Sequence, residues 1–308
     1  MKSRKVVFTG QWQIEMQTEE LAADSLNPRE ILIQTEYSTV SPGTELACAA
    51  GKAASWFQFP RVPGYITLGQ VVRCGSDVTE FDVGDTVIHN AGHVQSSIAD
   101  VDKKLMFKVP EELEHRKAAF TKLMSIAMAS IRKSNIELGD YVAVIGLGLV
   151  GNLAAQFAQL QGGFVLGIDL DEERLNKAKE CRISNVLKYE KSSIYRQVSE
   201  FTGEKGIMTL IDATGIPSVV VDSLPFMAKH NAEVILLGSP WDKCEGDLSE
   251  LFNYIHLGTR GAMTFKGAHE IVLPGKHHPF MKHSIERNFE IIFQLFNQEK
   301  VIIDKLIT

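Results

Sequence analysis

The pattern of hydrophobic and polar positions changes near residue 115. Before that point, short stretches of β-branched and aromatic residues are separated by proline and glycine, as in strands that are joined by turns. The strands that this pattern predicts lie at residues 6–9, 30–37, 69–74, 85–89 and 97–101. The first part of the chain is therefore expected to form a small antiparallel barrel or sandwich.

After residue 115, continuous apolar runs alternate with segments that carry apolar residues at helical spacing. Helices are predicted at residues 116–135, 149–160, 172–181, 194–202 and 217–228. Strands are predicted at residues 141–146, 164–169, 185–189, 208–213, 233–238 and 262–266. This alternation indicates a parallel sheet with helices on both faces, so the expected fold class is α/β, with a doubly wound domain.

Composition and charge narrow the class of protein. The chain has 308 residues, of which 44% are hydrophobic and 23% charged, as in a soluble globular protein with about two domains. Because 38 acidic residues outnumber 32 lysines and arginines, neither nucleic acid nor an anionic membrane is the expected partner. No apolar run approaches the ~18 residues of a membrane span, and residues 1–10 lack the apolar region of a signal peptide. Four widely spaced cysteines fit reduced thiols, so we expect a cytoplasmic protein. With nucleic acid and membrane disfavoured, the expected partner is a small-molecule substrate.

A glycine-rich turn joins the predicted strand at 141–146 to the helix that follows it. Its sequence is Gly146-Leu147-Gly148-Leu149-Val150-Gly151. In this G-x-G-x-x-G pattern the first glycine permits a tight turn, the second lets the backbone approach a pyrophosphate, and the third lets helix and strand pack closely. The pyrophosphate would lie at the helix N-terminus, where free N–H groups and the helix dipole favour negative charge.

Asp169 ends the next predicted strand, where a carboxylate can read the adenosine ribose of a dinucleotide. It would accept hydrogen bonds from the ribose hydroxyls and repel a 2′-phosphate, so NAD(H) is expected rather than NADP(H). Leu170 and Arg174 follow it and are further candidates for contact with this half of the cofactor. In the alternative interpretation, the glycines only form a tight turn and Asp169 only caps the helix that starts at residue 172.

Two later strands are expected to end at the same edge of the sheet, where ligands bind in folds of this kind. The turns that follow them contain Thr214 and Gly215, and Gly238 and Ser239. These residues are candidates for contact with the nicotinamide half of the cofactor. Each turn could equally be an ordinary connection, because threonine and the preceding Asp212 are common hydrogen-bonding turn residues.

Histidines and aromatic residues offer further candidates that have simpler explanations. His89 and His93 have the i, i+4 spacing of a helical metal site, but they lie in a glycine-containing turn, so a metal site is not expected there. His283 lies in a polar loop and is expected at the surface. Trp56 and Phe57 belong to an aromatic cluster that either covers a substrate or packs in the core.

The order of these motifs resembles the medium-chain dehydrogenase/reductase superfamily, whose members include polyol, secondary-alcohol and threonine dehydrogenases and quinone reductases. Residues 62–87 look like the signature of its GroES-like domain, a glycine-rich run that ends in Gly84-Asp85-Thr86-Val87. Residues 138–140, the glycine fingerprint and residues 169–178 are similarly typical. The resemblance implies a GroES-like catalytic domain, a Rossmann domain, an active-site cleft between them and, commonly, a homodimer.

The resemblance also implies where the domains begin and end. The GroES-like domain is expected at residues 1–115, with residues 299–308 returning to it, and the Rossmann NAD-binding domain at residues 116–298. Members of the family typically continue with a further strand and helix beyond the point that residue 308 reaches. The sequence is therefore interpreted as a truncated or an unusually short member.

The chain departs from the zinc alcohol dehydrogenases of this family at each metal-ligand position. Pro42 stands in place of the cysteine ligand, Tyr65 in place of the histidine, Ile66 in place of the neighbouring glutamate, and the third ligand falls near Lys122. Proline and isoleucine cannot bind zinc, and an ammonium group repels it. Residues 90–102 also contain no cysteine, although the structural zinc of the family needs four. We expect no zinc of either kind.

The resemblance then implies a zinc-independent, NAD(H)-dependent oxidoreductase that transfers hydride between nicotinamide and an alcohol, a carbonyl or an activated alkene. Without zinc, hydrogen-bond donors have to stabilise the developing oxyanion. Thr44 matches the proton-relay hydroxyl of the family, Tyr65 can donate a phenolic proton, and Lys122 can supply positive charge. Further residues expected in the substrate cleft are Ser41, Glu45 and Trp56, with Glu45 bracing its loop or pairing with Lys122. The alternative is a protein that binds the dinucleotide but has lost catalysis, such as a redox sensor or a complex subunit.

Overall fold

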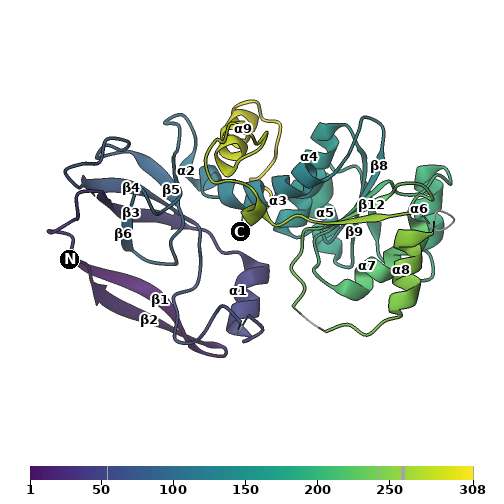
Figure 1. The fold of residues 1–308 in the computed structure, drawn as a ribbon, viewed down its shortest axis with the longest axis horizontal. Coiled ribbons are helices and arrows are strands. Elements are labelled where there is room, and N and C mark those ends of the chain that lie inside the picture. The colour runs from purple at the N-terminus through teal and green to yellow at the C-terminus, as the bar shows by residue number, and fades with distance from the viewer. Residues whose placement is uncertain (54, 242, 258–260, 308) are drawn as a thin grey trace. The chain divides into compact units, whose positions relative to one another are not determined.

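The computed structural model describes the chain apart from residues 54, 242, 258–260 and 308. Backbone contacts divide the chain into two compact units, which Figure 1 traces from the purple N-terminus to the yellow C-terminus. Unit 1 comprises Met1–Lys122 and Phe289–Asn297, and unit 2 comprises Leu123–Asn288 and Gln298–Thr308. Each unit therefore contains two separate stretches of the sequence.

The last segment of the chain groups differently from the expected return of residues 299–308 to the first domain. Ile302 donates its N–H to Gln156 Oε1 over 2.7 Å, Gln156 Nε2 donates to the Ile302 carbonyl over 3.0 Å, and Ile303 is buried, so this segment belongs to unit 2. Residues 289–297 group with unit 1 instead, because the ring of Phe289 packs on Phe107 with the centroids 4.2 Å apart. Helix residues, and not the end of the chain, complete unit 1.

Unit 1 is built on a five-stranded antiparallel sheet and a two-stranded hairpin. The hairpin pairs β1 (Lys2–Gly10) with β2 (Gln13–Glu20). The sheet has the order β6-β3-β4-β5-β7, formed by β3 (Glu30–Ser38), β4 (Thr67–Cys74), β5 (Thr86–His89), β6 (Ser96–Asp100) and β7 (Met106–Lys108). Ile31, Ile33, Val71 and Val87 are completely buried in its core. The small antiparallel domain that the sequence predicts is confirmed.

Three elements of unit 1 were not predicted. Strand β2 exposes most of its side chains, so it lacks the alternation that marks a half-buried strand. Strand β7 has only three residues. Helix α1 (Pro42–Ala49) starts at a proline in a segment that resembles a turn. Proline suits the first helical position because the N–H that it lacks has no partner there in any case.

The helix expected at residues 116–135 is two helices. Helix α2 (His115–Ala118) has Ala119 as its C-cap, and α3 (Thr121–Lys133) starts two residues after this cap. The break lies where the Ala119 carbonyl accepts a hydrogen bond from the buried Thr39 hydroxyl over 2.8 Å. A side chain that is distant in sequence thus binds this carbonyl, which is why periodicity alone predicts one continuous helix.

Unit 2 contains a six-stranded parallel sheet with the order β10-β9-β8-β11-β12-β13. The strands are β8 (Tyr141–Ile145), β9 (Phe164–Asp169), β10 (Asn185–Lys188), β11 (Thr209–Asp212), β12 (Glu233–Leu236) and β13 (Thr264–Gly267). Numbered from β8, this order is 3-2-1-4-5-6, the Rossmann arrangement. It places the point where the strand order reverses between β8 and β11. The doubly wound sheet predicted from the sequence is confirmed.

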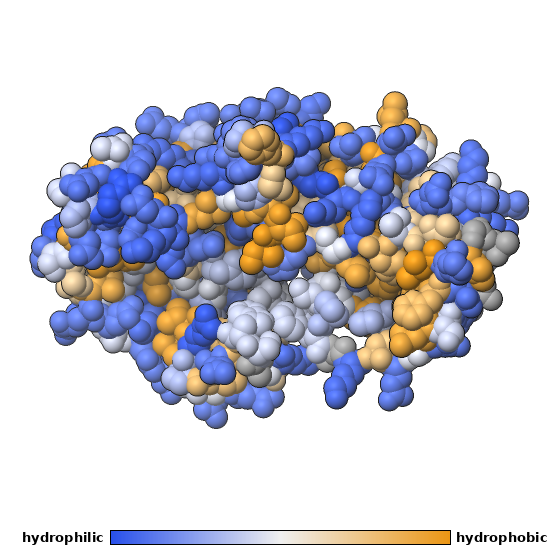
Figure 2. Space-filling model, viewed as in Figure 1, coloured by the Kyte–Doolittle hydropathy of each residue, from blue (hydrophilic) through white to orange (hydrophobic). Residues whose placement is uncertain are grey.

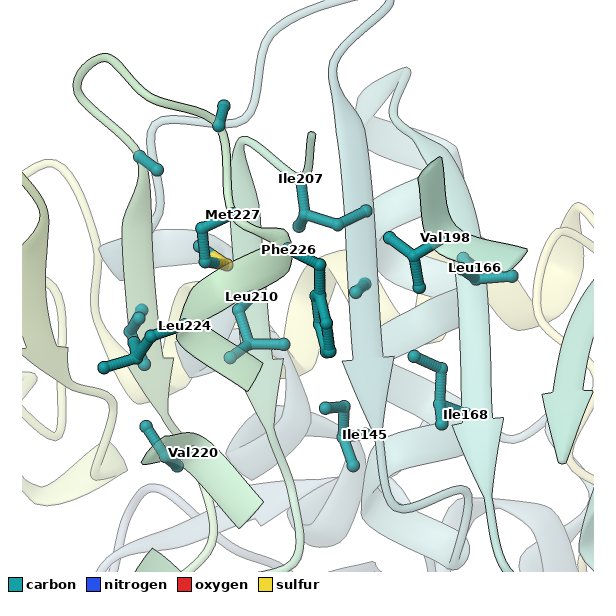
Figure 3. Close-up of a cluster of buried hydrophobic side chains, with 14 of the residues drawn as sticks. Ile145, Leu166, Ile168, Val198, Ile207, Leu210, Val220, Leu224, Phe226 and Met227 are labelled. Atoms are coloured by element: carbon teal, nitrogen blue, oxygen red, sulfur yellow. The ribbon is translucent and has the colours of Figure 1, made fainter. Parts of the chain in front are cut away.

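Side chains on both faces of the sheet are buried, as expected for continuous apolar strands. Ala143 and Ile145 of β8 join one large cluster, whereas Val142 and Val144 point to the other face and are equally buried. The cluster is completed by residues of α6 (Ile194–Thr202), α7 (Pro217–Ser223) and the short 3-10 helix η1 (Leu224–Phe226). Figure 3 shows Phe226 near its centre, with Leu210 of β11 on one side and Val198 of α6 on the other. Helices α4 (Leu149–Gln161) and α5 (Glu172–Glu180) follow β8 and β9.

Some helices of unit 2 differ from the expectation. The segment 217–228 is interrupted, because Pro225 has no N–H for an α-helical hydrogen bond and the chain forms α7 and then η1. Helix α8 (Leu248–His256) was not predicted, and neither was α9 (Ile285–Asn297), of which residues 289–297 belong to unit 1. On α8, Leu248, Phe252 and Ile255 remain exposed, and they contribute to the orange surface over that helix in Figure 2. In the described part of the chain, no helix is both long and apolar enough to cross a membrane.

A buried histidine in unit 1 makes the stability sensitive to acid. His89 on β5 is 3% exposed, its Nδ1 has no hydrogen-bond partner among the described residues, and burial lowers its pKa to about 4. An unfolded chain binds a proton at His89 near pH 6.5, whereas the folded chain does so only near pH 4. Stability is therefore full above pH 6.5 and falls as the pH drops from 6.5 to about 4.

We expect His89→Leu to remove this pH-dependent loss. Between pH 7.5 and pH 4.5, the free energy of unfolding of the wild type should fall by about 2–3 kcal/mol more than that of the variant. Urea unfolding at the two pH values measures the difference. An equal fall in both proteins would show that His89 is not buried in its neutral form.

Candidate functional site

The glycine-rich turn in unit 2 lies where the strand order of the sheet reverses. Gly146 follows β8 with a φ of +88°, a conformation that favours glycine, and its N–H donates to the Ile168 carbonyl over 2.8 Å. A Cβ on Gly146 would lie 2.9 Å from Cγ2 of Thr214, and a Cβ on Gly151 would lie 1.7 Å from the Gly146 carbonyl oxygen. These two glycines therefore satisfy requirements of the fold itself.

Gly148 is different, because the fold does not require a glycine there. It caps α4 with φ −60° and ψ −177°, which any residue can adopt, and a Cβ at this position would have no atom within 4 Å. The missing side chain leaves open space in front of the first turn of α4, whose N–H groups have no partner inside the helix. This cradle fits the pyrophosphate of a dinucleotide.

Asp169 at the end of β9 is 6% exposed and holds the glycine-rich turn. Its Oδ2 accepts the Leu147 N–H over 2.6 Å, and its Oδ1 accepts the Asp171 N–H over 2.9 Å. Arg174 Nη1 lies 3.6 Å from Oδ2. Each carboxylate oxygen can accept a second hydrogen bond, so the group keeps capacity for ribose hydroxyls.

The structure also tests the simpler explanation of Asp169. The cap of α5 is Asp171, whose Oδ1 accepts the N–H groups of Glu173 and Arg174 over 2.8 and 3.2 Å. Asp169 is therefore not needed to cap that helix. Leu170 between them is 71% exposed, which leaves an apolar side chain in solvent beside the carboxylate. A carboxylate at Asp169 that is not needed as a helix cap and an exposed side chain at Leu170 both fit residues that contact a bound ligand.

The turns after β11 and β12 pack tightly against each other. Asp212 accepts hydrogen bonds from the N–H and hydroxyl of Thr214 and from the Gly215 N–H, and burial raises its pKa. A Cβ on Gly215 would lie 2.3 Å from the Ser239 carbonyl oxygen, and a Cβ on Gly238 would lie 2.3 Å from the Gly215 nitrogen. Asp212 and Thr214 thus shape the turn, while Gly215, Gly238 and Ser239 bring two strand ends together beside the fingerprint.

In unit 1, the first turn of α1 carries three of the residues singled out from the sequence. The Ser41 N–H donates to Glu45 Oε1 over 2.8 Å, and the hydroxyls of Ser41 and Thr44 lie 3.5 Å apart. Glu45 Oε2 lies 2.7 Å from His93 Nε2, and both side chains are largely buried. Glu45 therefore braces its loop, which is one of the two roles that the sequence left open.

His93 connects this helix to two other segments and was missed as a functional candidate. Its Nδ1 hydrogen-bonds the Ser38 hydroxyl at the end of β3. Gly64, with φ +86°, lies directly against the ring, since a Cβ there would be 2.7 Å from Nε2. His93 thereby fixes the backbone next to Tyr65. His89 Nε2 instead lies 3.5 Å from the Ser97 hydroxyl, so the two histidines have different hydrogen-bond partners.

The remaining candidates of unit 1 have contrasting environments. Lys122 is 8% exposed at the second position of α3, next to the completely buried Thr121. Trp56 is 47% exposed and packs edge-on against the buried Phe57, with the ring centroids 5.9 Å apart. Phe57 therefore belongs to the core, whereas about half of the surface of Trp56 stays exposed.

Two family models match the chain. The alcohol dehydrogenase GroES-like domain matches residues 27–107, and the zinc-binding dehydrogenase matches residues 150–270. The chain belongs to the medium-chain dehydrogenase/reductase superfamily. The resemblance inferred from the sequence motifs is confirmed, and so is the combination of a GroES-like and a Rossmann fold.

Three relatives show how distant the similarity is in sequence. The chain is 28% identical to D-guloside 3-dehydrogenase of Shigella flexneri over 167 residues, which are 54% of this chain and 48% of that protein. The chain thus spans about half the length of the curated relatives it matches. Benzyl alcohol dehydrogenase from Acinetobacter calcoaceticus has a TM-score of 0.81 and 17% identity, covering 99% of this chain and 92% of that one. A short chain alcohol dehydrogenase from Escherichia coli CFT073, complexed with NADH, has a TM-score of 0.80 and 16% identity. The match covers 99% of this chain and 90% of that one.

Zinc, which the matched family name mentions, does not fit the side chains that this member provides. At the positions where the family resemblance implies zinc ligands, the sequence has Pro42, Tyr65, Ile66 and Lys122, which offer no thiolate, imidazole or carboxylate. Across the described ranges of the chain, no group of three or more His, Cys, Asp or Glu side chains could hold a metal ion. Glu45 and His93 form one close pair, but two ligands do not make a zinc site.

The pair of Glu45 and His93 is expected to contribute measurably to stability. Glu45→Ala or His93→Ala should each lower the free energy of unfolding by about 2–3 kcal/mol, because each leaves the partner buried without its hydrogen bond. The double variant should lose about 1–2 kcal/mol less than the two single losses added together. Urea unfolding of the four proteins measures this coupling. Strict additivity would contradict a direct interaction.

Proposed function

We propose that this protein is a zinc-independent oxidoreductase that uses NAD(H) and acts on an alcohol, a carbonyl or an activated alkene. The observation that carries the proposal is the open cradle at Gly148 beside the buried carboxylate of Asp169. The cradle fits a diphosphate, and the carboxylate fits the adjoining ribose. Related solved structures hold NADH or NADP, which supports a nicotinamide dinucleotide as the cofactor, and the preference for NAD(H) is proposed from Asp169.

The residues of unit 2 would hold the dinucleotide. The N–H groups at the start of α4 would bind the pyrophosphate, and Asp169 would accept hydrogen bonds from the adenosine ribose while keeping the turn in place through Leu147. Leu170 and Arg174 would flank the adenosine half, and the turns at Thr214 and Gly238 would flank the nicotinamide half. When bound, NAD(H) supplies the hydride acceptor or donor.

The choice between NAD(H) and NADP(H) depends on Asp169 and Arg174. We expect the wild type to bind NADH at least about 10-fold more tightly than NADPH, because Asp169 repels a 2′-phosphate. Asp169→Ala frees the Arg174 guanidinium, now 3.6 Å from the carboxylate, and should reverse the preference. Fluorescence titration with both cofactors measures it, and the double variant with Arg174→Met should show no preference. Tighter binding of NADPH by the wild type would contradict this role of Asp169.

Unit 1 supplies the proposed proton and charge chemistry. Thr44 offers a hydroxyl to pass on the proton of a substrate alcohol, Tyr65 offers a phenolic donor, and Lys122 offers a positive charge to an alkoxide. Ser41, Glu45 and His93 hold this loop, so they act as positioning residues. Trp56 offers an exposed aromatic face for the substrate. Because these donors replace a Lewis acid, the proposed reaction needs no zinc.

Assays of hydride transfer test the proposed activity. The substrates should include secondary alcohols, polyols, glycosides, their ketones and quinones, because the relatives include a D-guloside 3-dehydrogenase and alcohol dehydrogenases. We expect turnover by chelator-treated protein, followed as the change in NADH absorbance. NADH binding without turnover of any class would favour the other function, a dinucleotide-binding sensor or complex subunit. Turnover only after zinc is added would contradict zinc independence.

We further propose that the protein is a cytoplasmic homodimer. The support is the apolar surface of α8, formed by Leu248, Phe252 and Ile255, close in sequence to the edge strand β13. An exposed apolar helix beside an open sheet edge is suited to contact with a second copy. The net charge of −6 makes nucleic acid an unsuitable partner.

A further inference from the structure

Positively charged side chains gather in unit 2 where the end of α3 meets the start of α9. Arg132 Nε donates to Asn288 Oδ1 over 3.3 Å, and its Nη2 lies 3.4 Å from the sulfur of Met128. The neighbouring Arg287 donates from Nη1 to the Lys282 carbonyl over 2.6 Å. All of these contacts are to neutral acceptors, so neither guanidinium is neutralised by them.

No carboxylate compensates this charge in the part of the chain that the structure describes. The nearest acid in sequence, Glu286, uses its Oε2 to accept the His277 N–H over 2.7 Å. Burial lowers the pKa of Arg132, and the positive charge of Arg287 lowers it further. Guanidinium groups that are partly buried are normally paired with an anion, because an uncompensated charge is costly to remove from water.

His283 is part of the same cluster and is not the surface histidine that the sequence suggested. Its Nδ1 is buried and has no hydrogen-bond partner among the described residues. Its pKa is lowered to about 4, first by burial and then by the charges of Arg132, Lys282 and Arg287. Arg287 Nη1 is held 2.6 Å from the carbonyl of Lys282, which precedes His283, so a ring nitrogen without a partner among the described residues lies in a group of basic side chains that is suited to bind an oxygen atom of an anion.

We propose that Arg132, His283 and Arg287 bind a small oxyanion, either inorganic phosphate or a carboxylate. Arginine side chains bind such groups through two parallel N–H donors, and Arg132 retains donors that no described residue uses. The position of Arg132 in the last turn of α3 also favours a cation there through the helix dipole. The helix dipole accounts for a cation at Arg132, but it does not account for the presence of His283 and Arg287 in the same cluster.

Thermal unfolding in phosphate tests the proposal. Sodium phosphate should raise the unfolding temperature of the wild type by about 2–3 °C relative to sodium chloride of equal ionic strength. Sodium acetate at the same ionic strength distinguishes a carboxylate ligand from phosphate. Arg132→Met should abolish the rise and should be at least as stable as the wild type in chloride. Lys133→Met removes a neighbouring cation of the same helix and should keep the rise.

Two further variants make the outcome unambiguous. Gly148→Val blocks the cradle proposed for the dinucleotide, so a phosphate effect that persists in this variant arises elsewhere, independently of the proposed function. Arg287→Met replaces Arg132→Met if the latter fails to fold. The proposal is overturned if phosphate and acetate act no differently from chloride, if both arginine variants keep the full rise, or if Gly148→Val alone removes it.

Discussion

Gly148→Val is expected to lower the affinity for NADH by at least about 100-fold and to leave the unfolding temperature unchanged. The backbone at Gly148 has a φ of −60°, which valine can adopt, and a Cβ there meets no atom within 4 Å, so we expect the fold to accept the side chain. The same side chain would occupy the space in front of α4 that the pyrophosphate needs. Titration of NADH by protein fluorescence and a thermal unfolding scan measure the two effects.

Gly151→Ala provides the contrasting control. Its Cβ would lie 1.7 Å from the Gly146 carbonyl oxygen, so this variant should lose both NADH binding and stability. The two glycines are three residues apart, and only one of them is required by the fold. If Gly148→Val bound NADH as tightly as the wild type, the cradle in front of α4 would not be the pyrophosphate site.

Lys122→Met is expected to lower kcat about 10²–10³-fold while the Kd for NADH stays within about twofold of the wild type. Methionine keeps the length of the side chain and removes the positive charge that would stabilise the developing alkoxide. The buried position of Lys122 makes that charge effective, because few water molecules surround it. Steady-state kinetics on an identified substrate, with NADH titration of the same samples, measure both values.

Tyr65→Phe should show a smaller loss of kcat, about 10–10²-fold, since it removes one hydrogen-bond donor and no charge. Two surface substitutions serve as matched controls: Lys103→Met removes a 79% exposed lysine side chain, and Tyr37→Phe removes a hydroxyl from a tyrosine that is 38% exposed. Both controls should retain full turnover. Full turnover in Lys122→Met and Tyr65→Phe as well would remove these residues from the mechanism.

The parallel sheet and the fingerprint could be predicted because their signals are local. Strands β8 and β9 are continuous apolar runs, and a strand that is buried on both faces requires this composition. The glycines at 146 and 151 are fixed by a turn and by close packing within a few residues of each other. Asp169 was found because a carboxylate at the end of the second strand of such a sheet has a defined place.

The contacts that organise unit 1 could not be predicted, because they join segments that are distant in sequence. Glu45 and His93 are 48 residues apart, and nothing in either segment specifies the other. The spacing of His89 and His93 raised only the question of a shared metal and gave no indication of the pair with Glu45. A more useful signal was Gly64, whose missing side chain makes room for the His93 ring. Helix α8 was missed because its apolar residues do not form one buried face: Leu251 and Tyr254 pack against the core and are partly buried, whereas Leu248, Phe252 and Ile255 are exposed.

Calorimetric titration of NADH into chelator-treated protein of measured zinc content tests the central claim most directly. The account predicts one NADH bound per chain, with a Kd in the micromolar range (roughly −8 kcal/mol), in protein that contains no stoichiometric zinc. The absence of saturable binding, or binding that appears only when zinc is restored, would contradict it.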